Sequence, residues 1–285
     1  MCHMKISKDN IQFYMVNLKK DIDRRNITTQ RLSEVGICLQ VLPGFDCLDK
    51  NFDFSMYRSF ASAFWGDKNQ FKPGAFGCYL SHARYWKFML STGAEFAFII
   101  EDDVVPDKDA SFCLDISDFP SKFDFITFNE APYRWLKKLE ELKRGALKSE
   151  DKKYVSLSNV LINLISHGYF EKKIPALGAY GYLVSRKGAQ KMLSILEQQK
   201  ICMGVDYAML FNSLSETDIE QLKKVKNISQ LDKLFFFLNH VSHPGVYLKL
   251  NSYIYSPTYL VSIDSGFPTS LDHNYFISNS VFSCS

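Results

Sequence analysis

The sequence predicts an α/β protein in which a mostly parallel central sheet is flanked by helices. Two observations support this class: short apolar, β-rich runs alternate with segments of helical periodicity, and turn residues mark the breaks between them. The 285 residues can bury a full core, and 46% apolar against 23% charged residues is typical of a globular protein. Because no repeat or low-complexity linker divides the chain, we expect a single domain over residues 1–285.

A β-α-β unit is expected at the start of the chain. Residues 11–18 and residues 37–42 are apolar, β-rich runs typical of buried strands. Between them, apolar residues recur at helical spacing, with Asp23 as the expected N-cap and Gly36 as the helix stop.

A central strand is predicted at residues 96–100, because FAFII is a continuous apolar run of the kind found in strands covered on both faces. It follows an expected helix over residues 74–93, and a further strand at residues 123–128 continues a doubly wound alternation. An acidic triplet, residues 101–103 (EDD), stands directly after the central strand.

The latter half of the chain is less regular. Its expected elements are an exposed helix over residues 133–153, a strand at residues 182–184, a helix capped by Ser185, a helix over residues 205–214, a charged helix after Glu216, and strands near residues 246–250 and 259–263. We therefore expect an irregular, helical C-terminal region.

Composition excludes some classes of function. A net charge of +3 is too small for a nucleic-acid-binding protein, which normally shows a strong, clustered basic excess. The positive charge that gathers in one segment belongs to Lys137, Lys138, Lys143, Arg144, Lys148, Lys152 and Lys153, with four acids among them. This segment is either a solvated helix face or a lip that faces phosphorylated glycolipid or anionic lipid head groups.

The cysteines and the N-terminus indicate a cytoplasmic protein. Seven scattered cysteines without a C-x-x-C pair are typical of free thiols in a reducing compartment. The first residues lack the charged-then-apolar order of a signal peptide, and no run approaches the ~20 apolar residues of a membrane span. We expect at most a peripheral association with the inner membrane. The sequence leaves the oligomeric state open.

The acidic triplet is the main chemical signal. Two unit charges about 4 Å apart repel by roughly 4 kcal/mol at an effective dielectric constant near 20, so we expect something to offset the charge. A divalent cation is the usual solution, and oxygen-only ligands suit Mg²⁺ or Mn²⁺, which also bridge diphosphate oxygens. Ligands of open α/β sheets bind outside the carboxyl ends of the strands, where this triplet stands. A solvated turn or a helix N-terminus is the alternative.

Five segments in order resemble glycosyltransferase family 25, the bacterial lipooligosaccharide transferases related to collagen galactosyltransferases. They are residues 16–25 (VNLKKDIDRR), 77–82 (GCYLSH), 99–104 (IIEDDV), 181–189 (GYLVSRKGA) and 205–207 (VDY). The resemblance covers residues 11 to about 210 and weakens after Glu216.

The resemblance implies a GT-A-type nucleotide-diphospho-sugar transferase fold and an inverting mechanism. It implies Mn²⁺ or Mg²⁺ as cofactor, UDP-galactose as the most frequent donor, and a lipooligosaccharide, lipopolysaccharide or similar surface glycan as acceptor. Residues from about 11 to 130 would form the nucleotide-sugar-binding half, and residues from about 131 to 285 the acceptor-binding half.

By this resemblance, Asp103 ligates the metal directly. Asp102 and Glu101 contact the donor sugar and ribose, or hold the metal through water. Asn17 and Leu18 line the nucleotide pocket.

For several further residues the resemblance and a structural interpretation both stay open. Arg24 or Arg25 meets uracil or phosphate, unless both are helix-surface cations. Ser81 and His82 lie inside an amphipathic helix, where a lone His is more often a satisfied polar residue; the resemblance favours His82 as a group that contacts the donor or supports a residue that does. The adjacent Cys78 is interpreted as a buried structural thiol.

Inverting transfer needs a base that deprotonates the acceptor hydroxyl. Asp206 follows a small residue at a predicted helix start and matches the family's acidic position, although a plain N-cap is the alternative. Glu130, after the strand at residues 123–128, is the second candidate base.

A third metal ligand is sought near the C-terminus, where segment 256–264 resembles the family's last strand and favours Asp264 over His240, His243 and His273. The two histidines at 240 and 243 lack a Cys partner, which argues against zinc.

Two rival functions remain. A metal-dependent phosphohydrolase would use the same carboxylates, although the sequence shows neither a dense Asp/His set nor a P-loop. A non-catalytic glycan-binding module would use Tyr133, Trp135 and Tyr180 as stacking platforms.

Overall fold

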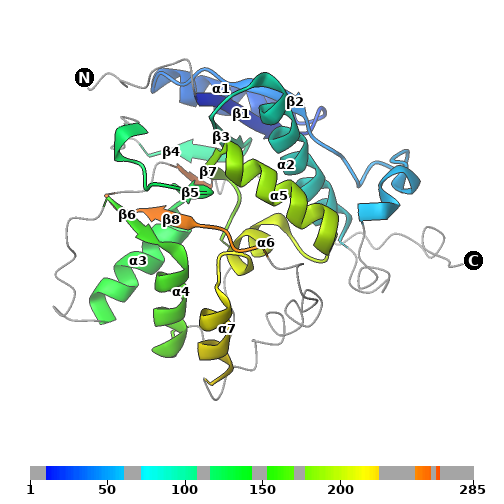
Figure 1. Cartoon of the computed structure of the whole chain (residues 1–285). Coiled ribbons are helices and arrows are strands. Elements are labelled where there is room, and N and C mark those ends of the chain that lie inside the picture. Colours follow the sequence, from blue (N-terminus) through cyan, green and yellow to red (C-terminus); the bar gives the residue numbers. More distant parts are fainter. Residues whose placement is uncertain are drawn as a thin grey trace, which may run out of the picture.

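The computed structural model describes residues 11–60, 72–107, 116–142, 153–169, 177–224, 248–257 and 261–263. These residues form a seven-stranded sheet with helices on both faces and a separate two-stranded ribbon, β4 (Val104–Pro106) with β9 (Val261–Ile263) (Figure 1). In spatial order the strands of the large sheet are β2 (Gln40–Pro43), β1 (Ile11–Asn17), β3 (Phe96–Glu101), β7 (Gly181–Ser185), β5 (Phe125–Thr127), β8 (Ser252–Tyr255) and β6 (Tyr154–Ser156).

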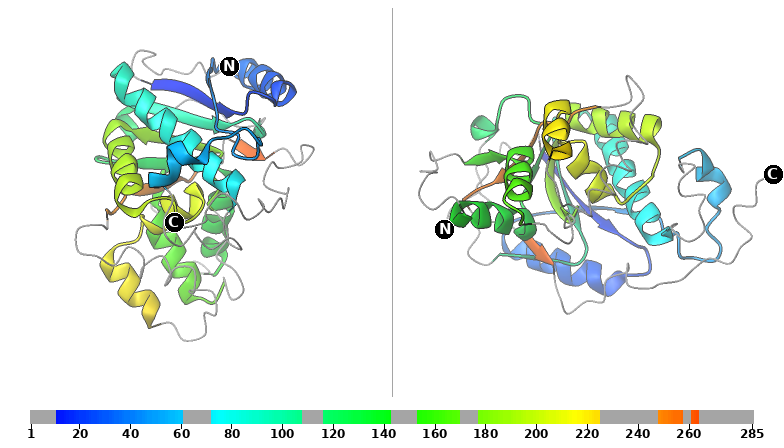
Figure 2. Two further views of the ribbon diagram at one scale, coloured as in Figure 1. Left: turned by 90° about the vertical axis from the view of Figure 1, so that its right-hand side faces the viewer. Right: turned by 90° about the horizontal axis from the view of Figure 1, so that it is seen from below.

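Helices account for most of the remaining described chain. They are α1 (Ile22–Glu34), α2 (Pro73–Thr92), α3 (Glu130–Leu142), α4 (Leu157–Ser166), α5 (Arg186–Gln199), α6 (Val205–Phe211) and α7 (Glu216–Lys223), with 3-10 turns at Phe54–Phe60 and Ile116–Asp118. Figure 2 shows α1 on the opposite side of the sheet from α2 and α5.

The expected mostly parallel sheet is confirmed. Strands β2, β1, β3, β5 and β8 run in one direction, and β7 and β6 run in the other. The strict doubly wound alternation is wrong, because β7 lies antiparallel between β3 and β5. Strand order depends on pairing between distant segments, which local periodicity does not report.

The side chains of β3 alternate between two cores, as the continuous apolar run predicts. Ala97 and Ile99 pack on the side of α2 and α5, whereas Phe98 and Ile100 pack with Leu32 of α1. Four β3 residues are completely buried, so the strand that ends in Glu101 is held on both faces. A rigid strand of this kind fixes where the following carboxylates begin.

The β-α-β opening is confirmed, since β1 pairs in parallel with both β2 and β3. Asp21, rather than the expected Asp23, is the N-cap of α1, and it makes no side-chain cap hydrogen bond. Its backbone N–H instead donates to Leu18 O in a turn, 2.9 Å away, which starts the helix two residues earlier. Gly36 follows the helix with a φ of +83°, as a helix stop requires.

Two helices approach their neighbours closely through glycine. A Cβ at Gly77 of α2 would lie 2.4 Å from Phe45 O, and one at Gly188 of α5 would lie 2.0 Å from Asp124 O. The expected end of α2 at Gly93 and the expected Ser185 cap of α5 are both present, the latter accepting from Gly188 N at 3.0 Å.

In the second half of the chain the sequence did not predict β6 or α4, and two predicted elements differ from the structure. The helix expected to be exposed over residues 133–153 begins at Glu130, and it buries Trp135, Leu136 and Leu139. The strand expected near residues 246–250 is found at Ser252–Tyr255, where it pairs with β5 and β6.

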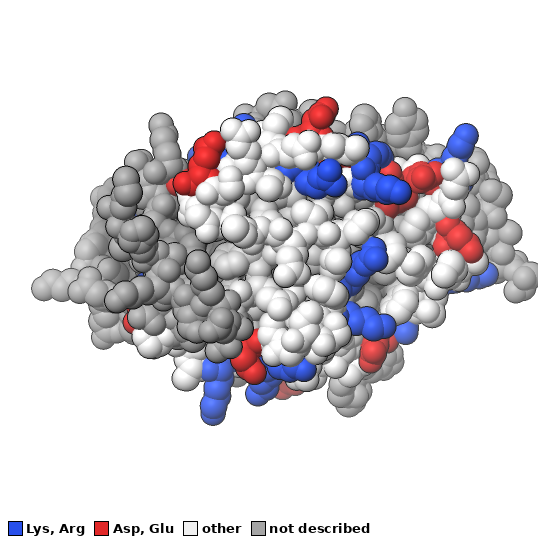
Figure 3. Space-filling model, turned by 90° about the horizontal axis from the view of Figure 1, so that it is seen from above, with Lys and Arg blue, Asp and Glu red and all other residues white. Residues whose placement is uncertain are grey.

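The described surface carries mixed charge. On the face seen from above in Figure 1, positive and negative side chains alternate around a broad uncharged centre (Figure 3). Described lysines of the basic segment are paired: Lys137 with Glu140 at 3.0 Å, and Lys138 with Glu141 at 2.8 Å. For this part of the segment, the solvated helix face is the better interpretation; residues 143–152 lie outside the described chain.

Four of the seven cysteines lie in the described part of the chain. Cys38, Cys47, Cys78 and Cys202 are free thiols. Among the helices of the described segments, none is long and apolar enough to cross a membrane.

Candidate active site

One edge of the sheet collects the polar residues of interest. The register between the parallel strands β1 and β3 pairs Val16 with Glu101, so Asn17 and the acidic triplet leave the sheet side by side. Asn129 follows the parallel strand β5, and Gly181 begins the antiparallel β7 at the same edge. These carboxyl ends form the crevice position expected for ligands of an open α/β sheet.

Asp102 is fully engaged by α1 and β1. Its Oδ2 accepts from Asn17 Nδ2 at 2.7 Å, and its Oδ1 accepts from Arg24 Nη2 at 2.5 Å. Its backbone oxygen accepts from Thr28 Oγ1 at 2.7 Å. Burial raises the pKa of Asp102 to about 6, and the Arg24 charge and the Asn17 hydrogen bond oppose that rise.

Arg24 also lies 3.1 Å from Asp103 Oδ2. The positive charge of Arg24 therefore offsets part of the repulsion that the sequence predicts between the three carboxylates. In the described structure Arg24 forms an ion pair with two carboxylates, and its expected contact with uracil or phosphate stays a prediction. Arg25 is half-buried beside it, and no described residue forms an ion pair with its side chain.

Asp103 is the least satisfied member of the triplet. Its Oδ1 is buried and has no hydrogen-bond partner among the described residues. Burial raises the pKa of Asp103 to about 7, the Glu101 charge raises it further, and Arg24 lowers it. An unpartnered buried acceptor costs about 1–3 kcal/mol, so this oxygen suits a ligand that offers positive charge. A carboxylate-rich set of this kind fits Mg²⁺ or Mn²⁺.

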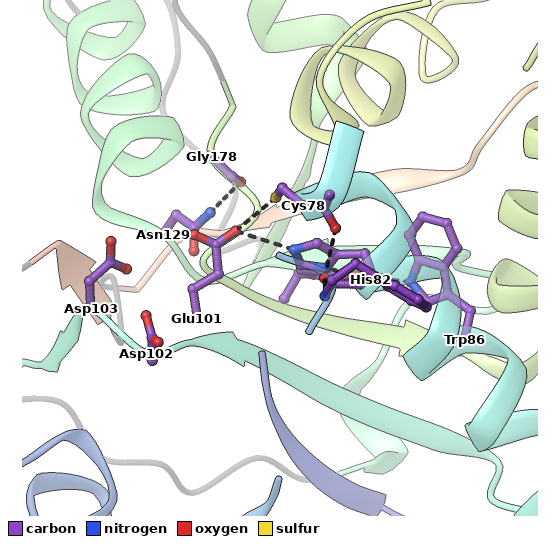
Figure 4. Close-up of polar contacts among 12 residues, drawn as sticks. Cys78, His82, Trp86, Glu101, Asp102, Asp103, Asn129 and Gly178 are labelled. Carbon is purple, nitrogen blue, oxygen red and sulfur yellow. Dashed lines mark hydrogen bonds and ion pairs between the residues drawn. The ribbon is translucent and has the colours of Figure 1, made fainter. Parts of the chain in front are cut away.

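Glu101 turns away from the other two carboxylates and toward α2 (Figure 4). Its Oε1 lies 3.2 Å from His82 Nε2 and accepts from Cys78 Sγ at 3.8 Å. The side chain remains 25% exposed. Glu101 is therefore directed toward α2, whereas Asp102 and Asp103 share Arg24 of α1.

The two polar residues expected inside α2 have separate roles. His82 is fully buried and its Nδ1 lies 2.9 Å from Tyr182 Oη. Ser81 Oγ donates to Gly77 O at 2.7 Å and accepts from Phe45 N at 2.8 Å, so Ser81 holds the loop that follows β2. The sequence did not separate these two neighbours.

Asp206, in the first turn of α6, lies near Glu101. Gly204 is the N-cap of this helix, so the plain N-cap interpretation of Asp206 is wrong. Burial raises the pKa of Asp206, a backbone hydrogen bond from Tyr207 lowers it, and the nearby charge of Glu101 raises it. Glu101 and Asp206 both raise the pKa of the Cys78 thiol, after the larger effect of desolvation; Cys78 is half-buried rather than buried as expected.

The second candidate base, Glu130, lies at the start of α3 and accepts from Arg134 Nη2 at 2.5 Å. The preceding residue is more informative. Asn129 Nδ2 donates to Gly178 O at 2.7 Å, while Asn129 Oδ1 is buried without a partner in the described chain. A Cβ at Gly181 would lie 2.9 Å from that oxygen, which explains a glycine there. The signal for Asn129, a polar residue directly after an apolar strand, is the same one that marks the triplet.

Comparison with known proteins identifies the family. Residues 10–209, more than half of the chain, match the profile described as "Glycosyltransferase family 25 (LPS biosynthesis protein)". The chain belongs to glycosyltransferase family 25. Two curated relatives named "Glycosyltransferase 25 family member" come from Aedes aegypti, 25% identical over 223 residues, and from Drosophila melanogaster, 25% identical over 205 residues.

The match covers most of this family 25 chain but a minor part of those relatives. It spans 73% and 69% of this chain, and 33% and 29% of the Aedes and Drosophila proteins. Among solved structures, a glycosyltransferase involved in the glycosylation of the major capsid of PBCV-1 aligns over 91% of this chain and 94% of its own, at 9% identity and a TM-score of 0.40. A197 from STIV aligns over 87% and 82%, at 12% identity and a TM-score of 0.31.

Burial changes the interpretation of several residues that the sequence singled out in this family 25 chain. Trp135 and Tyr180 are each 5% exposed, so they are not the stacking platforms that a glycan-binding module would need. Burial raises the pKa of Tyr180 to about 12, and its hydroxyl accepts from Ala131 N at 3.3 Å. The expected metal ligand Asp264, together with His240, His243 and His273, lies outside the described residues.

Proposed function

We propose that this family 25 chain is a metal-dependent inverting glycosyltransferase that moves a hexose, galactose from UDP-galactose, onto a lipooligosaccharide or lipopolysaccharide acceptor. The observation that carries the proposal is Asp103 Oδ1, a buried oxygen without a described partner in the acidic triplet that follows β3, beside the end of β1. Family membership supports the transfer of a sugar, and the association of the family with LPS biosynthesis supports the acceptor class.

Asp103 would hold the cation in this proposal, with Asp264 as the expected third metal ligand. Mn²⁺ or Mg²⁺ bound there supplies positive charge to the departing diphosphate. Arg24 neutralises Asp102 and only partly neutralises Asp103, whose Oδ1 it does not reach, and this supports Asp103 as the principal ligand.

The donor occupies the edge between β1 and β3. Asn17 and Leu18 line the nucleotide pocket, and Arg25 offers a positive charge close to it. Glu101 faces the sugar, because its carboxylate is partly exposed and directed away from the Asp102–Arg24 pair. Ser81 acts indirectly in this arrangement, through the loop that it holds beside Asn17.

Asp206 is the proposed base. The acceptor oxygen attacks the anomeric carbon, the bond from that carbon to the diphosphate oxygen breaks, and the acceptor proton passes to Asp206. A carboxylate with a raised pKa is a stronger base than an ordinary exposed one, and partial burial raises the pKa of Asp206. Glu130 remains the second candidate, but its carboxylate is engaged by Arg134.

A thermal-shift experiment with UDP-galactose, UDP-glucose and UDP-N-acetylhexosamines, each with and without Mn²⁺, tests the proposal. We expect stabilisation that needs both UDP-sugar and Mn²⁺, that is lost in Asp103→Asn, and that is kept in Asp118→Asn, an exposed acid paired with Lys153. Release of phosphate from UDP-sugars at the same rate without an acceptor would instead support the phosphohydrolase. Cytoplasmic location and peripheral contact with the inner membrane stay predictions.

A further inference from the structure

A buried chain of hydrogen bonds runs from the core to the candidate active site. Trp86 Nε1 donates to Tyr182 Oη at 2.9 Å, Tyr182 Oη lies 2.9 Å from His82 Nδ1, and His82 Nε2 lies 3.2 Å from Glu101 Oε1. Trp86 and His82 are one turn apart on α2, and Tyr182 comes from β7 (Figure 4). Trp86 and His82 are fully buried, and Tyr182 is 2% exposed.

Trp86 determines which group donates and which accepts in each hydrogen bond of the chain. An indole N–H can only donate, so Tyr182 Oη must accept from Trp86. The Tyr182 hydroxyl still has its own hydrogen to place, and burial raises the pKa of Tyr182 well above its ordinary value, which keeps that hydrogen on the oxygen. Among the described residues, the acceptor within reach is His82 Nδ1.

Accepting at Nδ1 places the proton of a neutral His82 on Nε2. That N–H then points at Glu101 Oε1. A ring protonated at Nδ1 would put two donors on Tyr182 Oη and leave the Tyr182 hydroxyl hydrogen without a described acceptor. An unsatisfied buried hydroxyl is unfavourable, so the chain selects one tautomer.

Glu101 Oε1 receives a second contact from the same helix. Cys78, one turn before His82, directs its thiol at Oε1 from 3.8 Å, and burial keeps the thiol protonated by raising its pKa. Both contacts hold the same oxygen. The other oxygen, Oε2, has no hydrogen bond to a described residue, and the side chain is 25% exposed, so Oε2 is the atom offered to a ligand.

The same side chains also resemble a metal site, since ligand atoms of Cys78, His82 and Glu101 lie within 4.8 Å of one another. A metal would take His82 Nε2, the nitrogen that the hydrogen-bond chain protonates. The two interpretations therefore exclude each other and can be separated by experiment.

We propose that Trp86 and Tyr182 fix His82 in the Nε2–H tautomer, and that His82 acts as a positioning residue that holds Glu101 Oε1 so that Oε2 faces a hydroxyl of the donor sugar. The part that concerns the donor rests on the proposed function. The tautomer does not, because it follows from the buried contacts alone.

The tautomer is tested by NMR of the full chain with ¹⁵N-labelled histidine, in which His82→Gln identifies the His82 signals. We expect one protonated nitrogen, Nε2, in the native protein, and a mixture of tautomers in Tyr182→Phe, which loses the hydroxyl. A ring protonated at Nδ1, or at both nitrogens, overturns the proposal. So does one equivalent of zinc that the purified native protein retains and Cys78→Ser loses.

A matched pair of variants tests the positioning. The amide nitrogen of His82→Gln can replace Nε2 and reach Glu101, whereas that of His82→Asn can replace only Nδ1. We expect His82→Gln to keep the KM for UDP-sugar within about threefold of the native value, and His82→Asn to raise it about tenfold, close to 1.4 kcal/mol. The KM for the acceptor should stay unchanged in both, which a general loosening of the fold would not produce.

The outcomes separate this inference from the proposed function. Equal donor KM values in the two variants overturn the positioning role while the transferase activity stands. If the native protein binds no UDP-sugar, the proposed function and the donor role fail together, and the NMR experiment still decides the tautomer. Thermal unfolding of each variant confirms that the comparison is made between folded proteins.

Discussion

Two adjacent carboxylates, Asp102 and Asp103, show how differently neighbours in sequence can be used. Asp102 has both side-chain oxygens paired, with Asn17 and with Arg24. Asp103 shares the same arginine through one oxygen and leaves the other buried and without a described partner. Because the residue type and the burial are alike, only the placement of α1 makes one carboxylate a structural anchor and the other a candidate ligand.

The largest expected effect belongs to Asp103. Asp103→Ala should lose roughly 3–4 kcal/mol of transition-state stabilisation, about three orders of magnitude in turnover. Steady-state assays with saturating Mn²⁺ and UDP-sugar measure it. In Asp102→Asn we expect reduced stability with the metal dependence retained, and turnover in Asp103→Ala equal to the native rate would remove Asp103 from the mechanism.

The next largest effect on activity is expected from substitution of Asp206. General base catalysis contributes about 10²–10⁴-fold, so Asp206→Asn should lower kcat by that order and leave the KM of the donor nearly unchanged. Glu130→Gln is the matched comparison, since its carboxylate is tied to Arg134 and should matter little. A larger loss in Glu130→Gln than in Asp206→Asn would exchange the two assignments.

Substitution of Arg24 tests whether Asp102 serves as a structural anchor. Breaking a buried ion pair by removing one partner typically costs about 3–5 kcal/mol, so Arg24→Met should lower the free energy of unfolding by about that amount without metal. Added Mn²⁺ should recover part of the loss, because a cation again meets the carboxylates. Arg25→Met, one residue away, should change little; denaturant unfolding of both variants decides the matter.

The smallest effect concerns pH. The pKa of Asp103 is about 7 in the folded protein, whereas in the unfolded chain it is near the ordinary 3.8. The folded state therefore binds more protons in this window, so the stability of the metal-free protein should fall as pH rises from about 4 to about 7. Relative to Asp103→Asn, the native protein should lose stability across this window. Unfolding midpoints that keep a constant difference across this window would contradict it.

Mn²⁺ should reverse the same trend, since cation and proton compete for one carboxylate. The increase in melting temperature produced by Mn²⁺ should grow from pH 6 to pH 8 in the native protein, and this growth should be absent in Asp103→Asn.

Local signals in the sequence predicted the elements that carry the site. The apolar run before Glu101, the glycine after α2 and the Ser185 cap of α5 are all read from neighbouring residues, and each is present. The family resemblance likewise places Asp103 and Asp206 at strand and helix ends, where the structure has them. Periodicity and capping act over a few residues, which is why they are visible without a fold.

What the sequence by itself determined is the order of the elements from β1 to β3, the acidic strand end and the family. Only the tertiary structure decided that β7 lies between β3 and β5, that Arg24 pairs with Asp102, and that Trp86 and Tyr182 set the direction of the bond from His82 to Glu101. These arrangements join residues up to 96 positions apart. The free energy that selects them comes from burial and from pairing buried polar atoms, both of which exist only once distant segments have packed.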